Sequence, residues 1–284
     1  MFEVKKYFKG RSLLIATRHG KEKVMAPILR AALGVKCFTS DNVDSDIFGT
    51  FTGEIPRADG AVETLRNKCR YFMEKCGADL AIASEGSFGP HPNLIMLPAD
   101  EEWVILIDDQ NGFEIMARTL STATNYSGMY VDNFNDLTHF AYSVSFPSHA
   151  LILRDKQEGN REIVKGITDA SSLSLLFERM KKKYDRVFVE TDMRAMYNPM
   201  RMQVIAEATE QLIQKILHVC PSCASPGYDV VHAELGLPCE ICSLPTKSVL
   251  RLQYACKKCH HQSSVVFPNQ KQKENPMYCD HCNP

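Results

Sequence analysis

Four CxxC pairs lie in the last quarter of the 284-residue chain and are the strongest chemical signal in its sequence. Two thiolates at this spacing hold one metal ion from a tight turn, and two such turns complete a tetrahedral zinc site with no open position. Eight of the eleven cysteines follow this pattern, so we expect two structural zinc ions. The expected ligands are Cys220, Cys223, Cys239, Cys242, Cys256, Cys259, Cys279 and Cys282.

The order of these cysteine pairs along the chain leaves two arrangements open. Sequential pairing joins the first pair to the second and the third to the fourth, whereas nested pairing joins the inner two and the outer two. The intervals of 15, 13 and 19 residues between successive pairs each suit a hairpin. We favour the sequential arrangement.

A second group of chemically capable residues follows the predicted strands of the first 218 residues. Ligands of α/β sheets usually bind beyond the carboxyl ends of the strands. Strand 12–17 runs into a basic loop, strand 79–84 into the acidic, glycine-rich loop 85–92, and strand 186–190 into a polar stretch. The candidate ligand-binding residues there are Thr17, Arg18, His19, Lys21, Ser87, Arg194, Asn198 and Arg201, and the candidate catalytic residues are Glu85, Glu190 and Asp192.

These residue types suit the chemistry of phosphates. Carboxylates such as Glu85, Glu190 and Asp192 are ligands for Mg²⁺, and arginine and lysine side chains neutralise phosphate oxygens. Glycines in the loops let the backbone approach a ligand closely. The combination is typical of metal-dependent cleavage of a phosphoanhydride, with Mg²⁺ as its cofactor.

Strands and helices alternate over the part of the chain that carries these residues. This alternation, together with the hairpin signal of Asn111-Gly112, predicts an α/β domain with a mixed sheet and flanking helices over residues 1–218. A small double zinc-ribbon domain follows over residues 219–284. The expected strands are 12–17, 35–39, 79–84, 103–109, 113–119, 149–155 and 186–190, and the expected helices are 24–33, 59–76, 134–144, 169–183 and 199–218.

The charge of the chain limits its partners. The formal net charge is −1, and the tail carries six Lys/Arg against five Asp/Glu before the negative charge of eight thiolates on two zinc ions is added. The tail therefore lacks the positive charge that attracts the phosphates of nucleic acids, and we do not expect nucleic acid binding. No apolar run is long enough for a signal peptide or a membrane span, so we expect a cytoplasmic protein that does not enter membranes.

Several strings of the chain resemble an uncharacterised bacterial family that is known only as a domain of unknown function. The resemblance covers nearly the whole chain and implies no activity. It is carried by the CxxC tail together with FGTFTGEIPR (48–57), ASEGSFGPHP (83–92), STATNY (121–126), FPSHALI (146–152), GITD (166–169) and ETDMRAMYNPMRM (190–202).

The N-terminal part also resembles the inosine triphosphate pyrophosphatase-like fold, whose members hydrolyse non-canonical nucleoside triphosphates with Mg²⁺. The similar segments are LLIATRHGKEK (13–23), residues 63–89 and the stretch 194–201. The resemblance implies that Thr17 and Lys21 or Lys23 bind phosphate, that Lys68 is the helix lysine of the site, and that Glu85 is a metal ligand or base.

Three functions remain open at this point. The leading hypothesis is a Mg²⁺-dependent phosphohydrolase acting on a nucleotide or a related phosphorylated metabolite. The alternative is a non-enzymatic module that binds a nucleotide or, through its zinc tail, a protein partner. A third reading is that the ribbons bind RNA or single-stranded DNA through exposed aromatics such as Tyr254 or Tyr278.

Overall fold

The computed structural model describes residues 2–40, 43, 60–157 and 161–284. The polar residues, glycines and proline of segment 40–57 predict a loop, and all of this segment except residues 40 and 43 lies outside the described residues. Two compact units divide the chain: a larger one over Phe8–Ile213, and a smaller one made of residues 1–7 with Gln214–Pro284. The boundary expected between residues 218 and 219 stays a prediction.

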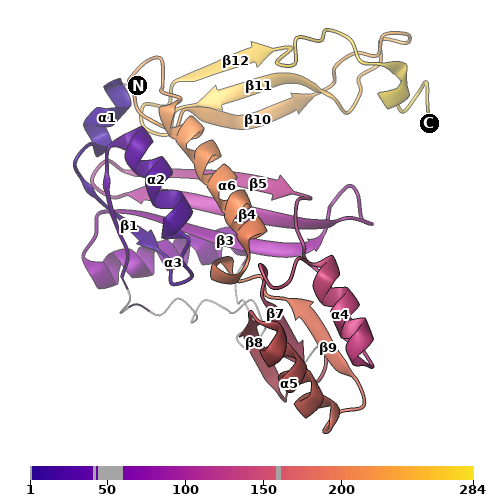
Figure 1. Cartoon of the computed structure of the whole chain (residues 1–284). Coiled ribbons are helices and arrows are strands. Elements are labelled where there is room, and N and C mark those ends of the chain that lie inside the picture. The colour runs from indigo at the N-terminus through magenta and orange to yellow at the C-terminus, as the bar shows by residue number, and fades with distance from the viewer. Residues whose placement is uncertain (1, 41–42, 44–59, 158–160) are drawn as a thin grey trace. The chain divides into compact units, whose positions relative to one another are not determined.

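A five-stranded mixed sheet forms the centre of the larger unit, with strand order β2-β1-β3-β4-β5 (Figure 1). β1 pairs in parallel with β2 and β3, while β4 is antiparallel to both of its neighbours. The mixed sheet expected from the sequence is thus confirmed. Its strands are β1 (Ser12–Ala16), β2 (Lys36–Phe38), β3 (Leu80–Pro90), β4 (Pro98–Asp108) and β5 (Phe113–Ser121).

Helices flank this sheet because its strands are apolar on both faces. Leu14, Ala81 and Ile105 pack against α3 (Ala61–Cys76) through the stripe that includes Leu65, Cys69 and Phe72. The other face carries α2 (Glu22–Leu33) and the first turns of α6 (Pro199–Leu217), with α2 and α3 on opposite sides of the sheet (Figure 1). Both α2 and α3 end at a left-handed glycine, as expected for a C-terminal stop.

A second sheet, entirely antiparallel and with strand order β6-β9-β7-β8, completes the larger unit. Two helices pack on it around a core that includes Leu153, Phe177 and Val189. The sequence patterns indicated β7, β9 and both helices but not β6 or β8. The elements are β6 (Gly128–Val131), α4 (Phe134–Ser143), β7 (Leu151–Arg154), β8 (Ile163–Ile167), α5 (Ala170–Lys181) and β9 (Val187–Thr191).

The segment from Glu85 to Pro90 is a strand and not the loop expected from its glycines and prolines. It continues β3 and pairs with the start of β4 as far as Pro90 opposite Pro98. Glycine is needed inside this strand for a steric reason. A Cβ at Gly86 would lie 2.2 Å from Glu102 Oε1 on the neighbouring strand. The glycine that suggested a loop therefore marks a close approach of side chains to the backbone.

The smaller unit contains α1 (Phe2–Phe8), whose residues up to Tyr7 belong to it, and a three-stranded antiparallel sheet. β11 lies between β10 and β12. The four CxxC turns precede β10, connect the strands and follow β12. The strands are β10 (Asp229–Leu235), β11 (Val249–Ala255) and β12 (Gln262–Val266).

Candidate functional site

Two clusters of four cysteines form in the smaller unit, one at each end of its sheet. One cluster consists of the first and third CxxC pairs, and the other of the second and fourth. Among the described residues, these are the groups of three or more cysteine, histidine or carboxylate side chains that come close enough to hold a metal ion. Together they form a double zinc-binding module.

The sulfur positions suit tetrahedral coordination. The Sγ atoms of Cys220 and Cys259 lie 3.7 Å apart, and those of Cys242 and Cys279 lie 3.6 Å apart. A tetrahedron with Zn–S bonds of about 2.3 Å has edges of about 3.8 Å. The distances exceed the roughly 2.0 Å of a disulfide, and all eight cysteines are free thiols.

The backbone of each turn is built to present its two sulfurs. In all four turns, the amide that follows the second cysteine donates to the carbonyl of the first, as from Ala224 to Cys220 at 2.9 Å. Ala224, Ser243 and His260 occupy this position in the first three turns and have positive φ angles of 55°, 59° and 59°. A non-glycine residue rarely adopts this conformation, so the repetition indicates a common geometric requirement of metal binding.

Both pairings considered in the sequence analysis, sequential and nested, are wrong. The connections between adjacent strands of an antiparallel sheet alternate between its two ends. The turn before β10 therefore lies at the same end as the turn between β11 and β12, while the other two turns share the opposite end. The topology of three strands, rather than the length of any one interval, decides which thiolates meet.

A small aromatic core supports the first of these clusters. Tyr228 is 4% exposed and stacks on Tyr254 with ring centroids 5.7 Å apart. Its neighbours include the buried sulfurs of Cys220 and Cys256. Tyr254 is thus part of the interior of the module, whereas Tyr278 is 61% exposed.

In the larger unit, Lys21 is the central residue of a buried group of charges. It is 2% exposed and precedes the first turn of α2. Its Nζ donates to the carbonyl oxygen of Ser84 at 3.0 Å and to the Ser84 hydroxyl at 2.9 Å. Burial, followed by the nearby Arg201, lowers the pKa of Lys21 to about 7. The ammonium group therefore lies among neutral oxygens and is easily deprotonated.

Arg201, in the first turn of α6, is 1% exposed and pairs with a buried carboxylate on β4. Its Nε donates to Glu102 Oε1 at 2.6 Å, and its Nη1 donates to the carbonyl of Met193 at 2.6 Å. Its guanidinium also lies over the ring of Phe88, 5.1 Å from the centroid. Gly86 makes room for this pair, because a Cβ there would lie 2.7 Å from Arg201 Nη2.

Lys68 and Glu85 form a second buried pair, with Nζ and Oε1 2.6 Å apart. Since side chains alternate along a strand, Glu85 faces α3 whereas Ser84 and Gly86 face α2 and α6. β1 pairs with β3 only as far as Ala16 opposite Ala83. The residues from Ser84 to Gly86 therefore flank the loop that follows β1.

His19 lies in that loop, and the charged residues described above act on its imidazole. Burial lowers its pKa to about 3, with further contributions from Lys21, Lys68, Arg201 and Arg194 in that order. Four cations, two from the helices α3 and α6 and two from the loops that contain Lys21 and Arg194, thus act on one imidazole. The four cations all disfavour protonation of His19, and three of them, Lys68, Arg194 and Arg201, also pair with a carboxylate.

The remaining candidate residues have structural partners. Glu190 pairs with Arg154 on the second sheet, with Oε1 and Nε 2.8 Å apart. Asp192 is fully buried and accepts from the Gly166 amide at 3.0 Å and from Arg194 Nη2 at 2.6 Å. Glu190 therefore does not belong to the group around Lys21. Asp192 holds the side chain of Arg194.

Four other candidates lie around this group. The Thr17 hydroxyl accepts from the His19 amide at 3.2 Å, and Arg18 is exposed. The Ser87 hydroxyl donates to Glu101 Oε2 at 3.2 Å on the side of the sheet that faces α3. Asn198 Oδ1 accepts from the Arg201 amide at 3.0 Å and caps α6, as its place before Pro199 suggested.

Sequence analysis missed two residues of the group, Asp100 and Glu102. Both are 0% exposed and lie two positions apart on β4, on the face that meets Arg201. Burial and the neighbouring Glu102 raise the pKa of Asp100 to about 8. Asp100 and Glu102 alternate with the half-buried Glu101 and Trp103, but this pattern predicts a shared face only if β4 begins at Pro98 rather than at Trp103.

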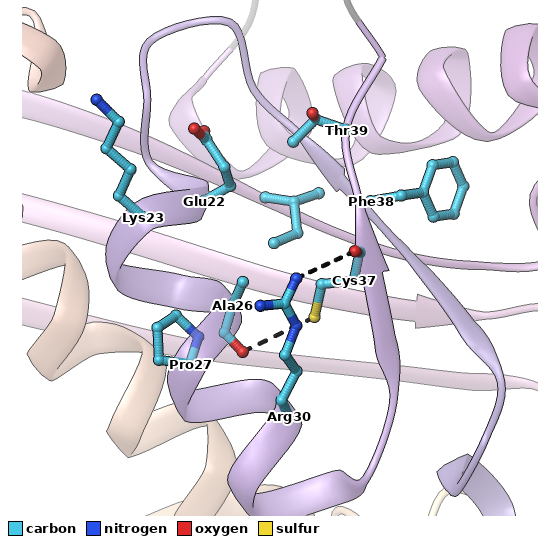
Figure 2. Close-up of a pocket in the computed structure, with 9 residues that line it drawn as sticks. Glu22, Lys23, Ala26, Pro27, Arg30, Cys37, Phe38 and Thr39 are labelled. Atoms are coloured by element: carbon cyan, nitrogen blue, oxygen red, sulfur yellow. Dashed lines mark hydrogen bonds between the residues drawn. The ribbon is translucent and has the colours of Figure 1, made fainter.

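A pocket of about 320 Å³ lies beside the first turn of α2, next to Lys21 in the chain (Figure 2). Ile15, Ala26 and Pro27 form its apolar wall, while Glu22, Lys23, Arg30 and Thr39 supply polar groups. Figure 2 shows Arg30 directed toward the carbonyl of Cys37 across this pocket. Its size and mixed lining suit a small organic ligand.

The comparisons with known proteins add a family but no activity. A family model described as "Domain of unknown function (DUF6671)" matches residues 68–284. A search of curated proteins finds no match. Among solved structures, protein VC0702 from Vibrio cholerae is 14% identical over 39% of this chain and 63% of that chain, with a TM-score of 0.29. None of these findings confirms the resemblance to the inosine triphosphate pyrophosphatase-like fold.

No helix among the described residues combines the length and the hydropathy that crossing a bilayer requires.

Proposed function

Since the chain belongs to the DUF6671 family, whose description assigns no activity, we propose a function from its own geometry. The larger unit binds a phosphorylated small molecule, such as a nucleotide, beyond the end of β1 and cleaves it with Mg²⁺. The observation that carries this proposal is the buried ammonium group of Lys21, which among the described residues is hydrogen-bonded to neutral oxygens alone.

The pairing of the surrounding charges supports an anionic ligand. Lys68 pairs with Glu85, Arg194 with Asp192 and Arg201 with Glu102, each at a distance of 2.6 Å. Lys21 has no carboxylate at such a distance in the described part of the chain. A buried ammonium is costly unless an anion compensates it. A phosphate group would supply that compensation and accept hydrogen bonds from Lys21.

The site also has groups for the rest of the ligand and for the reaction. The pocket beside α2 would receive the part of the ligand that is not phosphate. Glu85 is the candidate to accept the proton of an attacking water, and Lys68 would orient it. Mg²⁺ usually binds through one or two carboxylates and the phosphates of the substrate, and it would polarise the phosphoryl oxygens.

We expect Lys21→Met to weaken binding of a nucleoside triphosphate about 10- to 100-fold, because it removes a charge-assisted hydrogen bond. Glu85→Gln should lower turnover about 100-fold or more by removing the proton acceptor. Release of phosphate or pyrophosphate from a panel of nucleoside triphosphates with Mg²⁺ measures turnover, and calorimetry measures binding. The matched controls are Lys36→Met and Glu74→Gln, which alter exposed residues of the same unit.

Nucleotide binding by Lys21→Met and turnover by Glu85→Gln at wild-type levels would contradict the assignment. Nucleotide binding without any turnover in the wild type would instead favour the non-enzymatic binding module.

Ligand affinity should fall as the pH rises through 7. Lys21 binds the anion in its charged form, and its pKa in the free protein is about 7. A bound anion raises that pKa, so binding takes up a proton and becomes weaker above pH 7. Calorimetry with a triphosphate from pH 6 to 9 measures the slope. Lys21→Met should show a flatter profile, and an equal slope in both proteins would assign the effect to another group.

The smaller unit has a structural role in this proposal. Each cluster supplies four thiolates and leaves no coordination position for a substrate, so the two zinc ions would hold the fold together. A protein partner of the zinc module and a cytoplasmic location stay predictions of the sequence analysis.

A further inference from the structure

A row of buried oxygen atoms lies on β4 and β5 without hydrogen-bond partners among the described residues. The atoms are Asp100 Oδ1 and Oδ2, Glu102 Oε2 and Thr119 Oγ1. Asp100 and Glu102 are 0% exposed, and Thr119 is 6% exposed. A buried carboxylate normally has several hydrogen bonds, because a buried oxygen without a partner loses the hydration that it has in the unfolded chain. Three such oxygens in one place indicate that something else compensates them.

The register of the strands brings these atoms to one face of the sheet. Asp100 and Glu102 are two positions apart on β4, and Thr119 is the direct partner of Glu102 on β5. Gly86 is the partner of Glu102 on the other side, and it leaves the space above Glu102 open to side chains. Arg201 donates a hydrogen bond to Oε1 of Glu102, whereas Oε2 has no hydrogen-bond partner among the described residues.

The chemistry of this group favours a hard cation. Two carboxyl groups and one hydroxyl offer oxygen ligands only, and the guanidinium of Arg201 pairs with one of the two carboxylates, Glu102. Lys21 donates to Ser84 rather than to these oxygens. We propose that Asp100, Glu102 and Thr119 form a binding site for a divalent cation of the Mg²⁺ class, with water completing its coordination.

This inference rests on the proposed function in one respect, because it names the residues that bind the Mg²⁺ of that reaction. Glu85 is engaged by Lys68, and Glu190 by Arg154, so these candidates have partners already. The site on β4 lies beside Arg201 and Lys21, the cations assigned to the phosphates. A cation there would stand between the protein and a phosphate oxygen, as in other Mg²⁺-dependent phosphoryl sites.

The site can be tested with Mn²⁺ alone on the full-length protein with zinc bound. Paramagnetic resonance of free Mn²⁺ gives the affinity, and the melting temperature with added Mg²⁺ gives an independent readout. We expect saturable Mn²⁺ binding in the wild type and at least about tenfold weaker binding in Asp100→Asn. Thr119→Val, which changes the volume little, should weaken binding by a smaller factor and serves if Asp100→Asn does not fold.

The matched control is Glu101→Gln. Glu101 is the next residue of the same strand, but its side chain faces the other side and contacts Ser87. Equal Mn²⁺ affinity in the wild type, Asp100→Asn and Thr119→Val would overturn the site, and so would an equal loss in Glu101→Gln. Mn²⁺ binding without turnover on any nucleotide would leave the site standing and remove the proposed reaction. Turnover without Mn²⁺ binding at this site would support the proposed reaction and overturn the cation site.

Discussion

Replacing Cys220 and Cys256 together by serine should leave one zinc ion per chain, whereas replacing Cys220 and Cys239 together should leave none. The first two cysteines belong to one cluster, so the other cluster remains complete. The second two belong to different clusters, and each cluster then keeps only three thiolates. Elemental analysis of the purified, reduced variants measures the difference directly.

The same experiment separates the three arrangements of the pairs. Sequential pairing would reverse the two results, and nested pairing would leave no zinc ion in either variant. Cys76→Ser is a matched control, because Cys76 is a thiol of the larger unit and should leave both ions in place. A structural zinc site contributes about 10–16 kcal/mol to folding. Loss of both ions should therefore unfold β10, β11 and β12, which limited proteolysis would show.

The metal ligands could be predicted from the sequence, but their partners could not. Spacing within a CxxC pair is local and determines that two sulfurs meet one ion. Which pairs share an ion depends on how many strands lie between them and where each strand turns. The expected hairpins were treated one interval at a time. A third strand, β12, continues the alternation past Cys256 and Cys259 and brings Cys279 and Cys282 to the end that holds Cys239.

The candidate site of the larger unit shows a similar limit. Lys21 and Arg201 were named from their positions after predicted strands, and the structure places both beside residues 84–86 of β3. Glu85 was expected to begin a loop after a strand that ends at Ser84, yet both are strand residues and face opposite sides of the sheet. Asp100 and Glu102 were missed because β4 was expected to start after them. Errors of a few residues at strand ends thus decide which side chains share a face.

Arg201→Met should destabilise the larger unit by about 3–5 kcal/mol, the usual cost of leaving a buried charge without its partner. The variant removes the hydrogen bonds of Arg201 to Glu102 and to the Met193 carbonyl, and it leaves Glu102 as an uncompensated carboxylate at 0% exposure. Urea unfolding can be followed through Trp103, the single tryptophan of the chain and the neighbour of Glu102 on β4.

The double variant Arg201→Met with Glu102→Leu separates the pair from simple loss of packing. With both charges removed, the free energy of unfolding should recover in part, because no buried charge remains unpaired. Arg179→Met is the matched control, since its pair with Glu162 has a side chain that is 50% exposed and should contribute little. Additive losses in the double variant would show that the two residues act independently. If Arg201→Met lowers the free energy of unfolding no more than Arg179→Met does, the Arg201 side chain is not a buried charge.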